Sequence, residues 1–119
     1  MASTKTYTTL LASTSITTSG GTIAGTAANT STAYGGAITI KLTNGSSAPT
    51  VAPEADVLVS GDGTNYKIIA SFYGDTTNSS VNQFAIDINP GYKYVNVQFS
   101  QATTNAYTAE AFWHELTTV

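Results

Sequence analysis

Residues 37–43 read AITIKLT, in which apolar and polar side chains alternate from Ile38 onward. Successive side chains of a β-strand point to opposite faces of the sheet, so the two isoleucines and the leucine share one face and the polar residues share the other. One buried face and one solvated face are typical of an antiparallel sheet. The stretch therefore predicts a half-buried strand.

Similar runs occur on both sides of this stretch and are separated by residues that favour turns. The run from Gly61 to Asn65 predicts a hairpin loop, because glycine and asparagine tolerate the positive φ of tight turns. No segment shows the 3.6-residue repeat of a helix. Further strands are predicted over residues 5–16, 55–60, 66–73, 81–88, 93–101 and 106–116. About seven or eight short strands predict an all-β fold, a single antiparallel β-sandwich of jelly-roll or immunoglobulin-like type.

The alternation also predicts which side chains fill the space between the two sheets. They are large apolar residues that fall on one face of each predicted strand. The predicted core positions are Ile38, Ile40, Leu42, Val57, Val59, Ile68, Phe72, Phe84, Ile86, Val95, Val97, Phe99 and Trp113.

The chain divides by composition into two parts. Residues 1–36 are rich in Thr, Ser and Gly and are predicted to be an N-terminal strand and arm. Residues 37–119 are predicted to be the β-sandwich core domain. Within the arm, residues 17–36 are expected to be a long loop or a weak strand. A segment this poor in large apolar groups cannot order itself alone, so we expect it to dock on a neighbouring subunit or a capsid while the rest folds without it. The candidate assembly contacts are Tyr7, Leu10, Leu11, Ile16 and Ile23.

Composition narrows the classes of partner. Charged residues make up 9% of the 119 residues, with four lysines, no arginine and a net charge of −3. Nucleic acids and anionic membranes are bound by clustered cations, which this chain lacks, so neither is an expected partner. The absence of cysteine excludes disulfides and thiolate metal sites. The first seven residues hold no signal-peptide core, so we expect synthesis in the cytoplasm.

The polar residues form no catalytic or metal-binding motif. His114 is the only histidine, and of the nearby acids only Glu110 shares its strand face. General acid–base chemistry needs a partner held close by, and no nucleophile elbow is present. Asp62 and Asn65 are interpreted as turn residues and not as part of a calcium loop. We therefore predict no catalytic residue, no metal, no cofactor and no enzymatic activity.

The tyrosines leave open a binding function as an alternative. Carbohydrate-binding modules stack sugars on exposed aromatic rings, although such rings also flank the core at strand ends, where an amphipathic side chain fits well. The candidate stacking residues are Tyr66, Tyr73, Tyr92, Tyr94 and Tyr107.

The run TNGSSAPTVAPEADVLVSGDGTNYKIIASFYGD, residues 43–75, resembles small β-sandwich virion proteins of tailed bacteriophages, including capsid decoration proteins. The features that carry the resemblance are the turn at 43–45, the proline-containing loop at 49–53 and the hairpin at 59–66. Strands at 92–97 and 109–113 also fit, so the likeness spans about residues 36–116. It identifies no functional residue, because these proteins act through shape and surface.

The resemblance implies a non-enzymatic virion structural protein, made in the host cytoplasm, that decorates or cements the capsid surface. Its expected partners are the major capsid protein or other virion proteins and further copies of itself, as a trimer or dimer. Strands with few charges at their edges pair readily with another chain, and symmetric association would cover them. The alternative is a carbohydrate- or receptor-binding module of a tail or fibre.

Overall fold

The computed structural model describes residues 4–18, 21–31 and 33–118, and every regular element among them is a β-strand. The strands are β1 (Thr4–Ile16), β2 (Ile23–Ala24), β3 (Ala28–Asn29), β4 (Gly36–Asn44), β5 (Glu54–Ser60), β6 (Lys67–Tyr73), β7 (Val81–Ile88), β8 (Tyr94–Phe99) and β9 (Tyr107–Thr118). The predicted all-β class is confirmed. No helix in the described part of the chain could cross a membrane.

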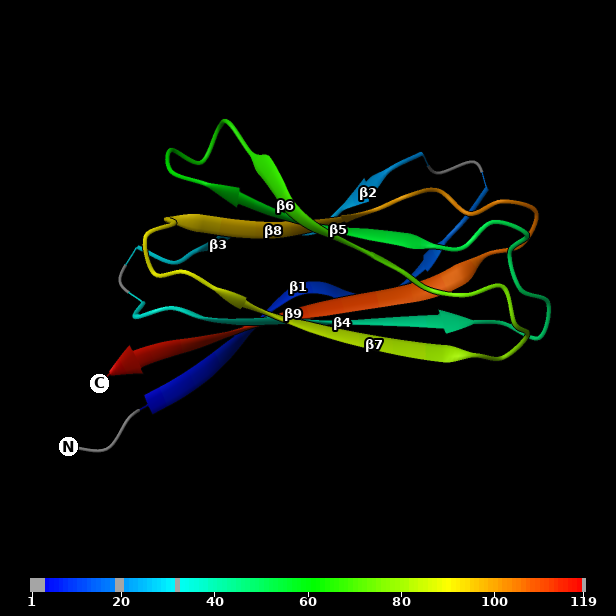
Figure 1. Ribbon diagram of the computed structural model, residues 1–119, viewed down its shortest axis with the longest axis horizontal. Helices are drawn as coiled ribbons and strands as arrows, with labels where there is room; N and C mark the ends of the chain where they lie inside the picture. Colours follow the sequence, from blue (N-terminus) through cyan, green and yellow to red (C-terminus); the bar gives the residue numbers. More distant parts are fainter. Residues whose placement is uncertain (1–3, 19–20, 32, 119) are drawn as a thin grey trace.

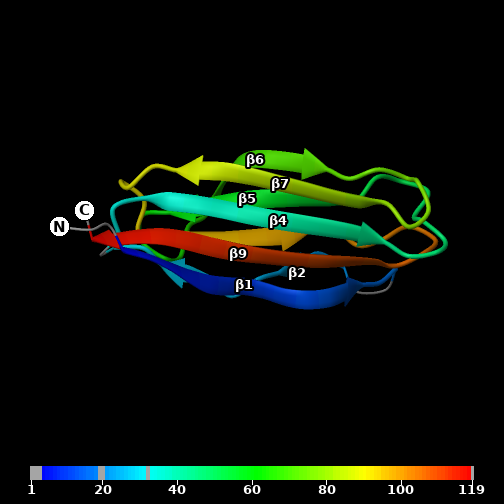
Figure 2. The same cartoon turned by 90° about the horizontal axis from the view of Figure 1, so that it is seen from below.

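The strands form two antiparallel sheets that face each other (Figure 1). The sheet that contains both terminal strands, here the terminal sheet, has the order β1-β9-β4-β7. The other contains the β5–β6 hairpin, has the order β2-β8-β5-β6 and is here the hairpin sheet; β3 also pairs with β8. The molecule measures 48 × 30 × 19 Å, and the start of β1 and the end of β9 lie at the same end of its long axis (Figure 2). The predicted β-sandwich is thus confirmed.

The strand order is that of a jelly roll. If β2 and β3 are counted as one interrupted strand, the antiparallel pairs are nested: β1 with β9, β2–β3 with β8, β4 with β7 and β5 with β6. Nested pairing arises when one long hairpin folds over and its arms separate into two facing sheets. Of the two predicted sandwich types, the structure has the jelly roll.

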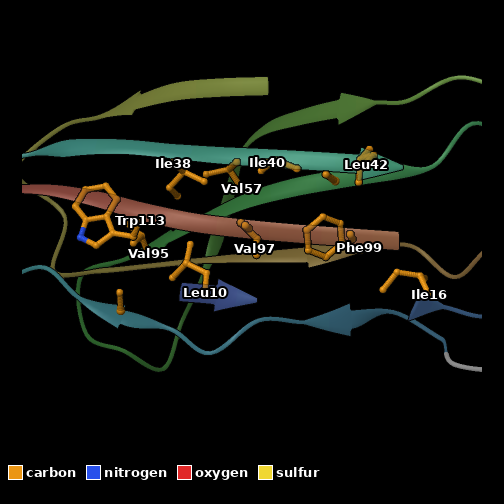
Figure 3. Packing of buried hydrophobic residues seen from close by; sticks show 14 of the residues in the cluster. Leu10, Ile16, Ile38, Ile40, Leu42, Val57, Val95, Val97, Phe99 and Trp113 are labelled. Carbon is orange, nitrogen blue, oxygen red and sulfur yellow. The ribbon is translucent and has the colours of Figure 1, made fainter. Parts of the chain in front are cut away.

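Side chains from the inner faces of both sheets fill the core (Figure 3). Nine of the thirteen predicted core residues are buried, and Phe72, Phe84 and Ile86 are partly buried against them. Ile68 was predicted wrongly, since its side chain is 46% exposed. A bulge in the β5–β6 pairing places Leu58 opposite Ile68 while Val57 faces Ala70. This shift of one residue turns Ile68 to the outer face.

The first 36 residues belong to the same sandwich. β1 pairs with β9 along most of its length, and Leu10, Ile16 and Ala28 are buried in the common core. Residues 17–36, expected to be a loop or weak strand, contain the short strands β2 and β3. This packing corrects the interpretation of an arm, because the segment supplies an edge strand to each sheet and finds its apolar partners within the chain.

The two long sides of the sandwich differ. On the closed side, where β1 lies beside β2 and β3, the Thr26 amide donates to the Leu10 carbonyl across the two sheets at 2.7 Å. Gly25 makes this approach possible, because a Cβ there would lie 2.5 Å from the Leu10 oxygen. On the open side, β6 and β7 are neighbouring edges (Figure 2), and Phe72 and Phe84 stack between them with ring centroids 5.0 Å apart.

Candidate functional site

The outer face of the terminal sheet carries a cluster of three rings, here the ring cluster: Tyr7 on β1 with Phe112 and His114 on β9. The register places Tyr7 opposite His114. Tyr7 meets Phe112 edge to face, with centroids 5.9 Å apart and planes at 78°, and its ring lies 6.2 Å from that of His114. Tyr7 is 68% exposed. Adjacent strands thus hold an aromatic surface open to solvent.

Polar side chains lie beside the ring cluster on the same sheet face. Thr39 Oγ1 and His114 Nε2 share a hydrogen bond of 3.0 Å. One step further along the strands, Lys41 Nζ lies 4.0 Å from Glu110 Oε1. Both pairs join β4 to β9, so the groups are held by the sheet and not by loops.

Two hollows run along this face. The first, of about 340 Å³, lies over β7, β4 and β9 and is lined by Gln83, Ala85, Lys41, Glu110 and Phe112, among others. The second, of about 280 Å³, is lined by residues at the start of β4 and the end of β9, together with Tyr34 and Asp87. Thr39 lines the first hollow and His114 the second, so their hydrogen bond joins the two linings. The two neighbouring hollows together are here called the track.

The open side presents a second kind of surface. Ile68 on β6 is 46% exposed and Val81 on β7 is 49% exposed. β7 pairs with β4 over its whole length without a register shift, and its other edge has no strand partner among the described residues. The backbone groups on that edge can therefore bond to another strand.

The five candidate assembly contacts do not form one surface. Leu10 and Ile16 are 2% and 0% exposed and are core residues, which corrects their assignment as assembly contacts. Leu11 and Ile23 are partly buried against the same core. Tyr7 alone of the five is widely exposed, and it belongs to the ring cluster.

The five candidate stacking tyrosines are also separated. Tyr107 is 1% exposed and donates its hydroxyl hydrogen to the Ser100 carbonyl, so it cannot stack on a ligand. Burial raises its pKa to about 12. Tyr66 and Tyr94 adjoin the β5–β6 loop, and Tyr92 lies in the turn between β7 and β8. Tyr73 lies at the opposite end of β6 from Tyr66. No single platform results.

Phe112 was missed at the sequence level, although a signal was present. Its neighbour Trp113 belongs to the alternate residues of β9 that point into the core. Because successive side chains of a strand point to opposite faces, Phe112 must point outward. A large aromatic residue at an outward position of a central strand is the feature that could have identified this face. Tyr7 could be assigned to it only once β1 was known to pair with β9.

The carboxylates of Asp56, Asp62 and Asp75 accept hydrogen bonds within loops and sheets. The Asp62 carboxylate accepts bonds from the Asn65 and Thr64 amides at 2.8 Å, which hold its pKa far below the ordinary value. Its interpretation as a turn residue is thus supported by its contacts. Within the described ranges no three histidine or acidic side chains gather as a metal site would require.

Glu54 and Asp56 form a carboxyl pair on the outer face of the hairpin sheet. The hydrogen bond with Asp56 raises the pKa of Glu54. Burial alone would raise the pKa of Asp56 as well, but hydrogen bonds from Glu54, Gln98 and Ser71 outweigh it and lower that pKa. Each Asp56 oxygen therefore already has a partner within the chain.

Fold and surfaces together define a jelly-roll module with an aromatic sheet face and an open edge. No protein-family model and no curated protein matches the chain. Among solved structures, it is similar to the SPBc2 prophage-derived protein YomS, with 14% identity, a TM-score of 0.56 and 96% of each chain covered.

Two further structures share the fold. One is the T13 viral particle of infectious bursal disease virus, with 12% identity and a TM-score of 0.65; 98% of this chain matches 31% of the viral chain. The other is CBM29_1, a family 29 carbohydrate-binding module from Piromyces equi, with 13% identity, a TM-score of 0.51 and 92% and 90% of the two chains covered. The chain spans about a third of the viral protein. At these identities the likeness concerns the fold.

Proposed function

We propose that this chain is a non-enzymatic structural protein of a tailed-phage virion, which decorates or cements the capsid surface as a homo-oligomer. The observation that carries the proposal is the open side, where the regular edge strand β7 lies next to the edge strand β6 and each strand carries an exposed aliphatic side chain, Val81 on β7 and Ile68 on β6. Natural proteins that stay monomeric protect such edges with charges, prolines or bulges. Here β7 carries one charged residue, Asp87, and no proline.

A second copy of this chain fits the open edge. Two β7 strands related by a two-fold axis at Phe84 pair antiparallel, as an isologous interface requires. In that register Asp87 of each copy faces Val81 of the other, so the like charges are not opposed. Phe84 faces its symmetry mate on the inner side, and the Phe72–Phe84 stack becomes covered.

The surface chemistry supports attachment to a particle. Only 9% of residues are charged, so contacts rest on short neutral polar and apolar side chains, whose interactions depend weakly on salt. The related folds include a prophage-derived protein and a chain of a viral particle, which supports a place in the virion. The carboxylates of Asp56, Asp62 and Asp75 are occupied by hydrogen bonds within the chain, in keeping with a non-enzymatic role.

Self-association is tested by placing charges on the open edge. The double variant Ile68→Glu/Val81→Glu puts two anions on exposed positions, and the new carboxylate at position 81 would face Asp87 of the other copy. Because like charges opposite each other destabilise a strand pair, association should weaken at least tenfold in analytical ultracentrifugation. Val51→Glu is the matched control, because Val51 is 62% exposed but lies in the β4–β5 loop. A monomeric wild-type chain, or equal association of the two variants, would contradict assembly through this edge.

Virion attachment is tested on particles made by the phage or prophage that carries the gene. The protein should co-purify with these particles, be lost from particles of a gene deletion, and rebind when added back at a saturable copy number. Immunogold labelling should place it on heads. Its absence from purified particles would overturn the proposed location.

A further inference from the structure

We infer that the outer face of the terminal sheet is a binding site for a neutral oligosaccharide. The site consists of the ring cluster and the track of two hollows beside it. It lies on a sheet face, whereas the proposed self-association uses the β7 edge, so the two surfaces can act independently.

The rings supply the apolar part of the recognition. A pyranose has an apolar face of C–H groups, which packs well on an aromatic ring that remains exposed. Tyr7 is 68% exposed, and its ring packs edge to face against the ring of Phe112, with the two ring planes at 78°. Because both strands are paired with neighbours, the cluster is held in place before a ligand arrives.

The polar groups beside the rings suit hydroxyl groups, which both donate and accept. The hollow offers an ammonium donor from Lys41, carboxylate acceptors from Glu110, and an amide with both functions from Gln83. The imidazole of His114 and the hydroxyl of Thr39 bond to each other and keep further capacity to bond outward. A mixed set of donors and acceptors around apolar ring surface is the usual composition of a small-ligand site.

The shape of the track favours a chain of sugars over a single sugar. It extends from Lys41 to Gly36 along β4, which at about 3.4 Å per residue is roughly 17 Å. Its charged groups are of both signs: Lys41 opposes Glu110, and Asp87 and Glu115 line the second hollow. A polyanion needs clustered cations, so a neutral glycan fits better than a sulfated one or a nucleic acid.

The first experiment uses the full chain on an array of neutral gluco-, manno-, xylo- and galacto-oligosaccharides with sulfated counterparts. The best-bound neutral tetrasaccharide is then titrated by calorimetry against four proteins: wild type, Tyr7→Ala, Tyr7→Phe and Tyr73→Ala. Tyr73 is the matched control, being 58% exposed but on β6 of the other sheet. The far-ultraviolet circular dichroism spectrum of each variant verifies its fold.

We expect Tyr7→Ala to weaken binding at least tenfold, Tyr7→Phe to stay within about threefold because the ring remains, and Tyr73→Ala to match wild type. Chemical-shift changes should concentrate on β9 and the facing residues of β4. Absence of any neutral glycan ligand, preference for the sulfated probes, or equal loss in the two alanine variants would overturn the inference. The Ile68→Glu/Val81→Glu variant should bind the glycan normally, so failure of the assembly proposal is distinguishable from failure of this one.

Discussion

The edge strands of the two sheets contact each other differently on the closed and open sides of the sandwich. On the closed side, backbone groups of the two sheets approach closely enough to bond, from the Thr26 amide to the Leu10 carbonyl, and Leu10 is buried beneath them. On the open side, the Phe72 and Phe84 side chains stack between the sheets, and Ile68 and Val81 stay exposed. The comparison shows that the two sheets are joined through the backbone on the closed side, whereas the open side leaves strand edges without a strand partner among the described residues.

The largest expected effect comes from removing the closed side entirely. Deletion of residues 1–30 removes β1, β2 and β3, together with buried Leu10 and Ile16. Each buried aliphatic side chain contributes about 2–5 kcal/mol, which is a large part of a domain's total stability of about 5–15 kcal/mol. The truncated chain should therefore lack a cooperative thermal transition by circular dichroism. A cooperative transition in the truncated chain would show that residues 37–119 fold alone, and deletion of residues 1–3 is the control.

Shortening one side chain on each side of the sandwich should reveal the same difference in stability on a smaller scale. Leu10→Ala on the closed side should lower the free energy of unfolding by about 2–5 kcal/mol. Ile68→Ala on the open side should cost less than about 1 kcal/mol, because 46% of that side chain is already in water. Urea denaturation measures both, and equal costs would remove the energetic distinction between the two sides.

The backbone contact of the closed side can be disturbed by one methyl group. A Cβ at Gly25 would lie 2.5 Å from the Leu10 oxygen and 3.0 Å from the Asn96 side-chain oxygen, so Gly25→Ala must push the strands apart. We expect a loss of about 1–3 kcal/mol, the usual cost of overpacking. Gly45→Ala is the control, since nothing lies within 4 Å of that position. A neutral Gly25→Ala would mean that the close approach contributes little.

The smallest expected effect concerns pH and the open side. The loops at both ends of β6 hold carboxylates: Asp62, bonded by the Asn65 and Thr64 amides, and Asp75, bonded by the Ser80 hydroxyl and the Thr77 amide. These bonds lower both pKa values below the ordinary 3.8. A carboxyl group with a lowered folded pKa stabilises the fold above its unfolded pKa and loses that contribution as the pH falls through the folded value.

The amide protons of β6 should therefore exchange faster relative to those of β4 at pH 3 than at pH 6, as followed by hydrogen exchange. Asp62→Asn/Asp75→Asn should show a smaller change in this ratio, because amide side chains do not titrate. Glu54 has a raised pKa, so its contribution to stability is present at low pH and is lost as the pH rises. Glu54→Gln removes this opposing contribution and is a useful companion variant. An unchanged ratio in wild type would argue against a role for the two loops in holding the open side.

Local pattern predicted much of the fold. The alternation in residues 37–43 correctly placed Ile38, Ile40 and Leu42 in the core, and the hairpin loop formed where Gly61 to Asn65 indicated. The error at Ile68 has a definite cause, because a one-residue bulge in the pairing inverts the parity of the residues beyond it. Parity read from a single strand cannot detect a bulge, which depends on the partner strand.

The candidate surfaces depended far more on the fold. Leu10 and Ile16 look like docking residues when residues 1–36 are considered alone, yet β9 and the hairpin sheet bury them. The ring cluster unites Tyr7 with Phe112 and His114, which lie more than a hundred residues further along the chain. Such a cluster is visible only after the first and last strands have been paired.

The sequence by itself determined the long strands, most of their inward and outward faces and the turns between them, because these follow from side-chain alternation and from the backbone preferences of glycine, asparagine and proline. Only the tertiary structure decided which strands pair, which side of the sandwich closes and which residues meet on the outer faces. The reason is that backbone hydrogen bonds between strands are nearly independent of side-chain identity, so local pattern leaves the pairing open. The nested jelly-roll order is selected when all inward faces are buried at once.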